Sequence, residues 1–162
     1  MLPPVVRAAI VARIVALSPV TSGSTAYSGS TVGLDGVAWT ECLYPMTPAF
    51  LPSTQEYLAA WVELGDVRPI ETRPYEDTQV VQEVAVIWLY PCRGMAEAEK
   101  VDFDRAWYAM AALYLHLLNP AWSPDFVVER VSGAALARPQ RVDEQGRLLC
   151  EIRIQVQYPL EA

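Results

Sequence analysis

Apolar and polar residues alternate over most of an eleven-residue run near the C-terminal end of the chain. In the run 148–158 one face carries Leu148, Cys150, Ile152, Ile154, Val156 and Tyr158, and the other face is largely charged or amide-bearing. A period of two is typical of an antiparallel strand with one buried face. A second run, 80–90, is rich in Val and Ile with little polarity on either face, which predicts a central strand.

Two other segments repeat their apolar residues at helical spacing. The spacing predicts a helix over 4–17, where a proline suits the first turn, and another over 102–118. In the second helix we expect Asp102 to cap the start and Asn119–Pro120 to end it. Its expected core-facing stripe consists of Phe103, Trp107, Met110, Tyr114 and Leu117.

The segment 57–64 allows two interpretations. Ser53 and Glu56 have capping-box spacing and Gly65 occupies a C-cap position, so a helix is possible. We favour a strand over 60–68, because its large apolar residues suit a pleated surface and Gly65 can mark a bulge. The choice between the two is close to even.

A weaker strand, interrupted by Gly133, is predicted over 126–137, with a turn at 143–146 before the terminal strand. The expected fold class is α+β: a single domain over 1–162, in the order α-β-β-α-β-β, with two helices on one face of an antiparallel sheet. A long loop rich in Ser, Thr, Gly and Pro, 18–52, is inserted after the first helix. Its second half is too apolar for a disordered linker, so we expect it to lie over the domain or against a partner.

Charge and length limit the classes of partner. The net charge is −7 and Lys100 is the only lysine, so the chain has no basic stripe for specific nucleic-acid binding. No apolar run approaches the roughly 20 residues needed to span a bilayer, and Arg7 and Arg13 interrupt the 5–17 stretch that superficially resembles a signal peptide. We therefore expect no membrane partner and cytoplasmic synthesis.

Candidate catalytic residues are few. His116 is the only histidine and lies among leucines, so a helix-flank histidine with one hydrogen bond is a better interpretation than a catalytic dyad or triad. The widely separated Cys42, Cys92 and Cys150 lack zinc-ligand spacing and indicate free, buried thiols. Neither a phosphate-binding loop nor a dinucleotide fingerprint occurs, so we expect no cofactor.

Four acidic residues lie close together in the sequence between positions 71 and 83. Glu71, Glu76, Asp77 and Glu83 could supply a carboxylate pair for hydrolysis or a hard-metal site. Arg73 lies among them, and an exposed loop of mixed charge explains the same residues without a reaction.

Several residues are better candidates for contacts between proteins. A second apolar strip lies opposite the core-facing stripe of helix 102–118, and large aromatic residues occupy two loops. Together with part of the polar loop 71–78, the predicted subunit or partner interface is Trp39, Tyr44, Arg73, Glu76, Asp77, Tyr108, Ala112, Leu115 and Trp122.

The order of elements resembles the tail-terminator or tail-completion (neck) proteins of long-tailed bacteriophages. The resemblance covers nearly the whole chain and is carried by VVRAAIVARIVAL, by AWVELGDVRP with QVVQEVAVIWLY, by DFDRAWYAMAALYLHLL and by RLLCEIRIQVQYP. The inserted loop 18–52 departs from the family's pattern.

This resemblance implies a structural virion protein without enzymatic activity. It implies a homo-oligomeric ring, six copies in the family, on the head-proximal end of the tail tube, assembled in the host cytoplasm. The implied partners are other copies of the chain, the tail-tube protein and a head-closure or connector protein, and DNA would pass through the lumen without specific binding. The alternatives are another head–tail connector subunit (head-closure or adaptor), a non-viral module that binds a small ligand or peptide on the open sheet face, and a hydrolase that uses the acidic loop.

Overall fold

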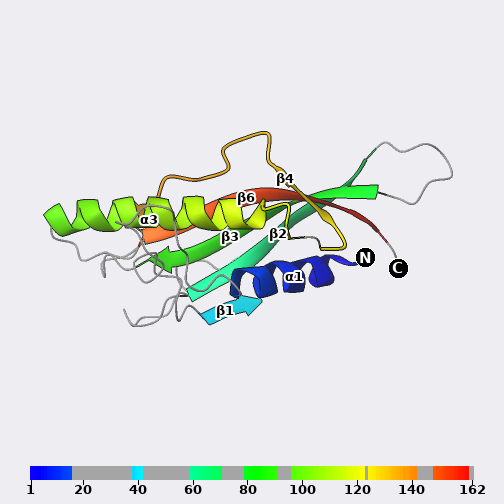
Figure 1. The fold of residues 1–162 in the computed structure, drawn as a ribbon, viewed down its shortest axis with the longest axis horizontal. Helices are drawn as coiled ribbons and strands as arrows, with labels where there is room; N and C mark the ends of the chain where they lie inside the picture. The colour runs from blue at the N-terminus through cyan, green and yellow to red at the C-terminus, as the bar shows by residue number, and fades with distance from the viewer. Residues whose placement is uncertain are drawn as a thin grey trace.

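The computed structural model describes residues 1–15, 38–41, 59–70, 79–90, 96–122, 124–141 and 148–160 (Figure 1). These residues form two helices and one mixed sheet, so the predicted α+β class is confirmed. In chain order the elements are α1 (Pro3–Val15), β1 (Ala38–Glu41), β2 (Ala59–Pro69), β3 (Gln79–Tyr90), α3 (Ala96–Leu117), β4 (Val127–Arg130), β5 (Gln140–Arg141) and β6 (Leu148–Pro159).

Two long strands form the centre of the sheet, whose order is β1-β2-β3-β6-β4, with β5 also paired to β6. Strands β3 and β6 are antiparallel and pair without a break from Gln79↔Pro159 to Tyr90↔Leu148. The predicted central strand is therefore confirmed, and it begins one residue earlier than expected. The short β1 differs from the other strands because it runs parallel to its neighbour β2.

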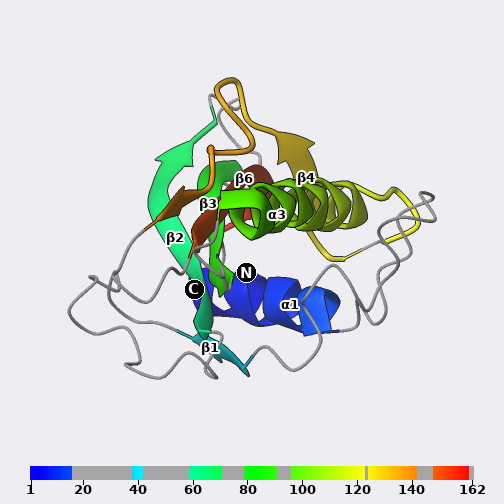
Figure 2. The same ribbon diagram turned by 90° about the vertical axis from the view of Figure 1, so that its left-hand side faces the viewer.

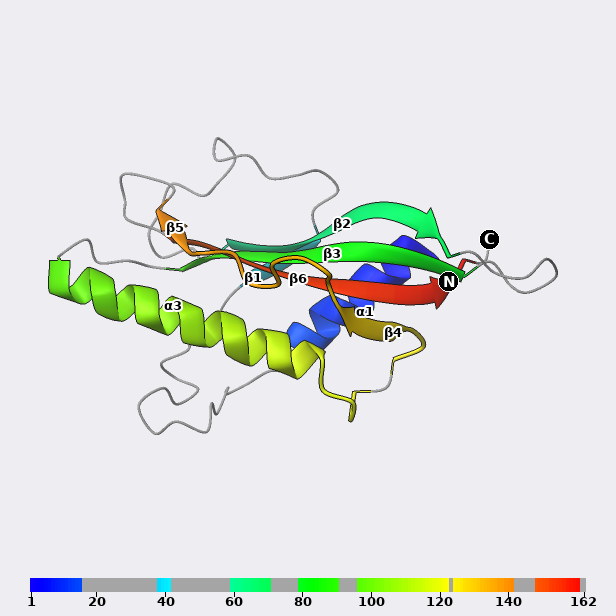
Figure 3. The same cartoon turned by 90° about the horizontal axis from the view of Figure 1, so that it is seen from above.

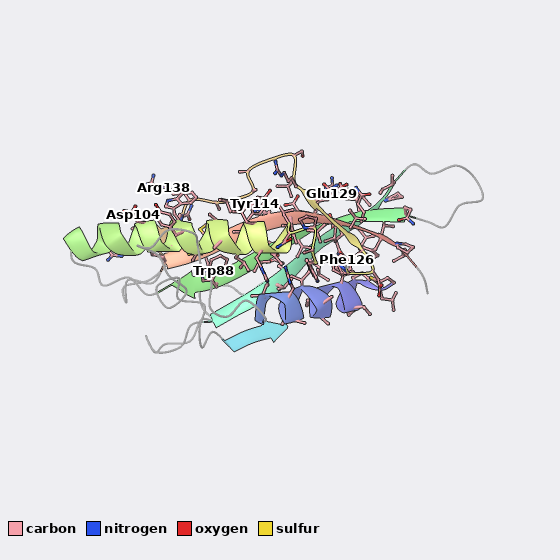
Figure 4. All side chains as sticks on the ribbon, in the orientation of Figure 1. Trp88, Asp104, Tyr114, Phe126, Glu129 and Arg138 are labelled. Atoms are coloured by element: carbon pink, nitrogen blue, oxygen red, sulfur yellow. The ribbon has the colours of Figure 1, made fainter. Side chains whose placement is uncertain are left out.

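Both helices cover the same face of this sheet, as Figures 2 and 3 show. The alternating apolar residues of β6 that the sequence indicated are all buried against them. Trp88 of β3, labelled in Figure 4, is also fully buried in this core. The two helices contribute Val6, Ile10 and Ile14 from α1, and Ala106, Ala109, Met110, Leu113 and Leu117 from α3.

The region 59–69 is a strand, which decides the ambiguity in favour of the strand interpretation. Its pairing with β3 shifts between Leu64 and Val67, so the bulge expected at Gly65 is also confirmed. A Cβ on Gly65 would lie 3.1 Å from the Glu83 carbonyl oxygen, which explains why the smallest residue occupies this position.

A buried amide holds the bulge in place. Gln82, which is 2% exposed, donates from Nε2 to the Gly65 carbonyl oxygen at 2.7 Å. The Tyr158 hydroxyl donates to Gln82 Oε1 at 2.9 Å. Because a bulge disrupts the local ladder of backbone hydrogen bonds, this side-chain network satisfies polar groups that would otherwise be buried without partners.

Helix α3 differs from the prediction in its first residue and in which of its residues are buried. It begins at Ala96, so Asp102 does not cap it. The segment Ala-Glu-Ala-Glu-Lys that precedes residue 101 consists of good helix formers, with acidic residues near the favourable N-terminal end, and these extend the helix. Trp107 was expected in the core but is 37% exposed, because the buried face follows the alanines Ala106 and Ala109.

Two predictions for irregular segments were wrong in part. The strand expected over 126–137 is limited to Val127–Arg130, and the chain then bends through the exposed Ser132 and Gly133. It rejoins the β6 edge near Leu136, where Arg153 N–H donates to the Ala135 carbonyl at 2.8 Å. The predicted loop 18–52 contains β1, and its other residues lie outside the described part, as does the turn predicted at 143–146.

The bulge network generates a test of stability. We expect Gln82→Leu to lower the free energy of unfolding by about 2–4 kcal/mol, because it leaves the Gly65 carbonyl and the Tyr158 hydroxyl buried without partners. Chemical denaturation would measure this change. The control Gln140→Leu, at an exposed position, should change it by less than about 0.5 kcal/mol. Equal effects of the two substitutions would contradict a role for the network.

Candidate functional site

The structure describes the side chains of four of the nine residues predicted at an interface. Tyr44, Arg73, Glu76 and Asp77 lie outside the described residues. Trp39 lies in the edge strand β1, but its side chain is outside the description. The other four predicted residues are Tyr108, Ala112, Leu115 and Trp122.

Two of these four lie on the outer side of α3. Tyr108 is 40% exposed and Leu115 is 65% exposed, and Trp107 joins them with 37% exposure. We call these three residues the α3 strip. Ala112, by contrast, is half-buried and packs against the core. The α3 strip is thus an apolar surface with two aromatic rings, a composition that is common where proteins contact each other.

The C-terminal ends of the two helices are joined by reciprocal hydrogen bonds. Arg13, in the last turn of α1, donates from Nη2 to the His116 carbonyl oxygen at 3.3 Å. His116, in the last turn of α3, has its ring Nε2 3.1 Å from the Arg13 carbonyl oxygen. Since that carbonyl can only accept, Nε2 carries the proton. Each side chain therefore binds a carbonyl in the last turn of the partner helix, and the His116 carbonyl also accepts from the Asn119 N–H at 3.4 Å.

Aromatic side chains extend this junction. The Arg13 guanidinium lies 5.4 Å from the centre of the Trp122 ring, a cation–π distance. Trp122 in turn meets Phe126 edge to face, with ring centres 5.7 Å apart. Trp122, which the sequence suggested as a loop anchor, therefore packs within its own chain on at least two neighbours.

The environment of His116 favours its neutral form. Burial lowers the pKa of His116 below its usual value, the hydrogen bond to the Arg13 carbonyl opposes this, and the Arg13 charge lowers the pKa further. The predicted role, a helix-flank histidine with one ring hydrogen bond, agrees with this geometry. A basic residue near the end of each predicted helix, Arg13 in 4–17 and His116 in 102–118, was the sequence signal for the junction, but the contact between these two residues depends on the tertiary fold.

An apolar groove of about 440 Å³ lies beside this junction. The outer side of α1 forms one wall through Val5, Ala9 and Ala12, and Trp122 with Phe126 forms the other. Val5 is 53% exposed at its rim. The groove is an apolar surface next to the charged Arg13.

Of the four acidic residues suggested for hydrolysis, only Glu83 lies within the described residues. It is exposed on β3, and its Oε1 accepts from Arg153 Nη1 at 3.2 Å. Arg153 also donates from Nε to Glu151 at 2.6 Å. Glu83 thus belongs to a charged cluster on the sheet face opposite the helices.

Metal-ligand and thiol chemistry depend on how the described His, Cys, Asp and Glu side chains are placed. The described residues contain no group of three or more His, Cys, Asp or Glu placed to hold a metal ion. Cys150 is free and buried, as the sequence predicted, and burial raises the pKa of its thiol. Among the helices described, none has the length and apolarity needed to cross a membrane.

No protein-family model matches the sequence, and no curated protein matches it.

The helix-end junction predicts a pH dependence. Because the folded state lowers the pKa of His116, the contribution of the neutral ring is fully present above its unfolded pKa, near 6.5, and is lost as pH falls through the folded pKa. We expect His116→Gln, which keeps a hydrogen-bond donor, to lose less stability between pH 7.5 and pH 5 than the natural protein does. Denaturant unfolding at several pH values would measure the difference. Since His116 is the only histidine, identical pH profiles would contradict this assignment.

Proposed function

We propose that this chain is a tail-terminator subunit of a long-tailed bacteriophage. In this proposal six copies form a ring at the head-proximal end of the tail tube, stop its growth and join it to the neck. The chain forms a single domain with the basic order α-β-β-α-β-β, to which β1 and β5 are short additions. It works in the virion as a structural protein, assembled in the host cytoplasm, without catalysis or a cofactor.

The observation that carries the proposal is the exposed α3 strip. Leu115 exposes two thirds of its surface, and Trp107 and Tyr108 each expose more than a third. Burying such side chains against a neighbouring copy would be favourable, because full burial of an exposed apolar side chain contributes roughly 1.5–3 kcal/mol and the exposed part of each of these would gain its share. A closed ring requires a heterologous interface, so in this proposal the α3 strip of each copy meets a different surface of the next copy.

The charge of the chain supports the same proposal. A ring around a DNA channel functions best if the polyanion does not adhere to it, and a net charge of −7 per copy disfavours such adhesion. The described sheet face is also polar, with carboxylates on three of its strands at Glu63, Glu83 and Glu151.

The same features are compatible with a different neck component, a head-closure or adaptor subunit. Both alternatives are rings of structural subunits, and they differ in the partner at each end. A terminator binds the end of a purified tail-tube assembly and stops its elongation, whereas a head-closure or adaptor subunit binds the connector. An elongation assay with purified tube protein therefore separates them. A chain that stays monomeric at micromolar concentration and leaves tube length unchanged would contradict the proposal.

The ring itself is tested by a charge placed in the α3 strip. We expect Leu115→Glu to raise the concentration needed for assembly by at least about tenfold, because the interface would have to bury a carboxylate. Light scattering coupled to size exclusion, with negative-stain microscopy, would show whether rings give way to monomers. The matched control Ser132→Glu adds the same charge at an exposed bend and should leave assembly unchanged.

A further inference from the structure

The sheet face opposite the helices carries a trough that runs along β3. Its floor is made of the apolar residues Val81, Ala85 and Ile87, with the carboxylate-bearing Glu83 between the first two, and these residues alternate along β3 with the buried residues of the core face. Charged and amide residues of the neighbouring strands β2 and β6 stand on either side, and the enclosed volume is about 380 Å³. This surface is distinct from the α3 strip, which lies on the helix-covered side.

The pairing register of β2 and β6 with β3 determines which side chains stand on either side of the trough. Across Ala85, Glu63 of β2 faces Arg153 of β6, so a small floor residue lies between an acid and a base. Four residues from Ala85 along β3, Val81 pairs with Arg68 of β2. Neighbouring strands lie roughly 4.8 Å apart, so groups on β2 and β6 are separated by roughly 10 Å across β3. That width admits the side chains of one additional polypeptide segment.

The wall on β2 is fixed in place by the bulge. The extra residue between Leu64 and Val67 brings Gly65 and Asp66 to the trough, where both contribute to its lining. The Gln82 amide, buried on the opposite face, holds the Gly65 carbonyl at 2.7 Å. Bulges commonly redirect side chains beside functional sites, and here the buried hydrogen bond makes that redirection rigid.

The charge of the trough is unbalanced. Its lining contains four carboxylates and two guanidinium groups, which leaves a net charge of −2. On the β6 side, Arg153 is held by Glu151 at 2.6 Å and by Glu83 at 3.2 Å, so its charge is already compensated. Among the described residues, none forms a hydrogen bond or ion pair with the side-chain carboxylate of Glu63 or Asp66. The β2 side carries these two carboxylates and one guanidinium, Arg68, so it keeps a net charge of −1 that a cation from outside can compensate.

We propose that this trough docks an extended, cationic segment of a partner protein, with an Arg or Lys side chain directed to Glu63 and Asp66. The floor from Val81 to Ile87 spans roughly 20 Å, which accommodates about six residues in extended conformation. Charge complementarity identifies the occupant, because the same carboxylates repel a nucleic-acid backbone. The trough lies within one copy of the chain, so the inference is independent of the proposed ring.

A peptide titration tests the proposal. The probe is a dye-labelled six-residue peptide with Arg at alternate positions and Ala between them, and its fluorescence anisotropy would be measured against the full-length protein at low salt. We expect saturable binding that Glu63→Gln weakens by at least about threefold, a typical loss for one exposed charge pair. The matched control Asp104→Asn removes the same charge from the exposed side of α3 and should leave binding unchanged (Figure 4).

Three results would overturn the inference. One is the absence of saturable binding, and another is an equal loss of affinity in Glu63→Gln and Asp104→Asn, which would indicate general attraction to an acidic protein. The third is that the protein binds a labelled DNA duplex and that Glu63→Gln changes the affinity for this duplex. The ring is tested separately by Leu115→Glu, which should leave peptide binding intact, so failure of either proposal can be recognised without the other.

Discussion

The unbroken pairing of β3 with β6 is the constraint on which the rest of the structure depends. All twelve residues of each strand are paired in register, so residues 80, 82, 84, 86 and 88 lie on the same face as the even-numbered residues of β6. A slip of one residue would turn the apolar set of β6 away from the helices. The helices can pack on one face because both central strands present their buried residues there, and the opposite face is consequently free to carry charge.

The parts of the fold that depend on local pattern could be predicted from the sequence. The alternation in 148–158 predicted both the strand and its buried face, since a period of two allows only one arrangement of its apolar residues. The two helices followed from their spacing of three and four residues. Gly65 was recognised as a bulge position because its neighbours suit a strand while glycine does not.

The parts that depend on distant partners could not be predicted in this way. Trp107 fits the helical stripe as well as any core residue does, and only the packing of the small Ala106 and Ala109 against the sheet turns it outward. The role of Gln82 requires Gly65 and Tyr158, which are 17 and 76 positions away. The same holds for the Arg13–His116 junction and the Arg153–Glu83 pair, because sequence separation conceals their proximity.

The edges of the sheet favour assembly through its faces. The edge strands β1 and β4 have only four residues each, and the part of β2 that β1 does not cover contains the bulge, Asp66, Arg68 and Pro69. Short strands, bulges, charges and proline are the devices by which proteins prevent unwanted strand pairing. If neighbouring chains do not extend the sheet, contacts would use the surfaces on its two sides: the apolar α3 strip and the groove beside α1 on the helix side, or the charged trough on the other. These surfaces differ in chemistry, so the proposed contacts with copies of the chain and with a cationic partner would not compete for the same surface.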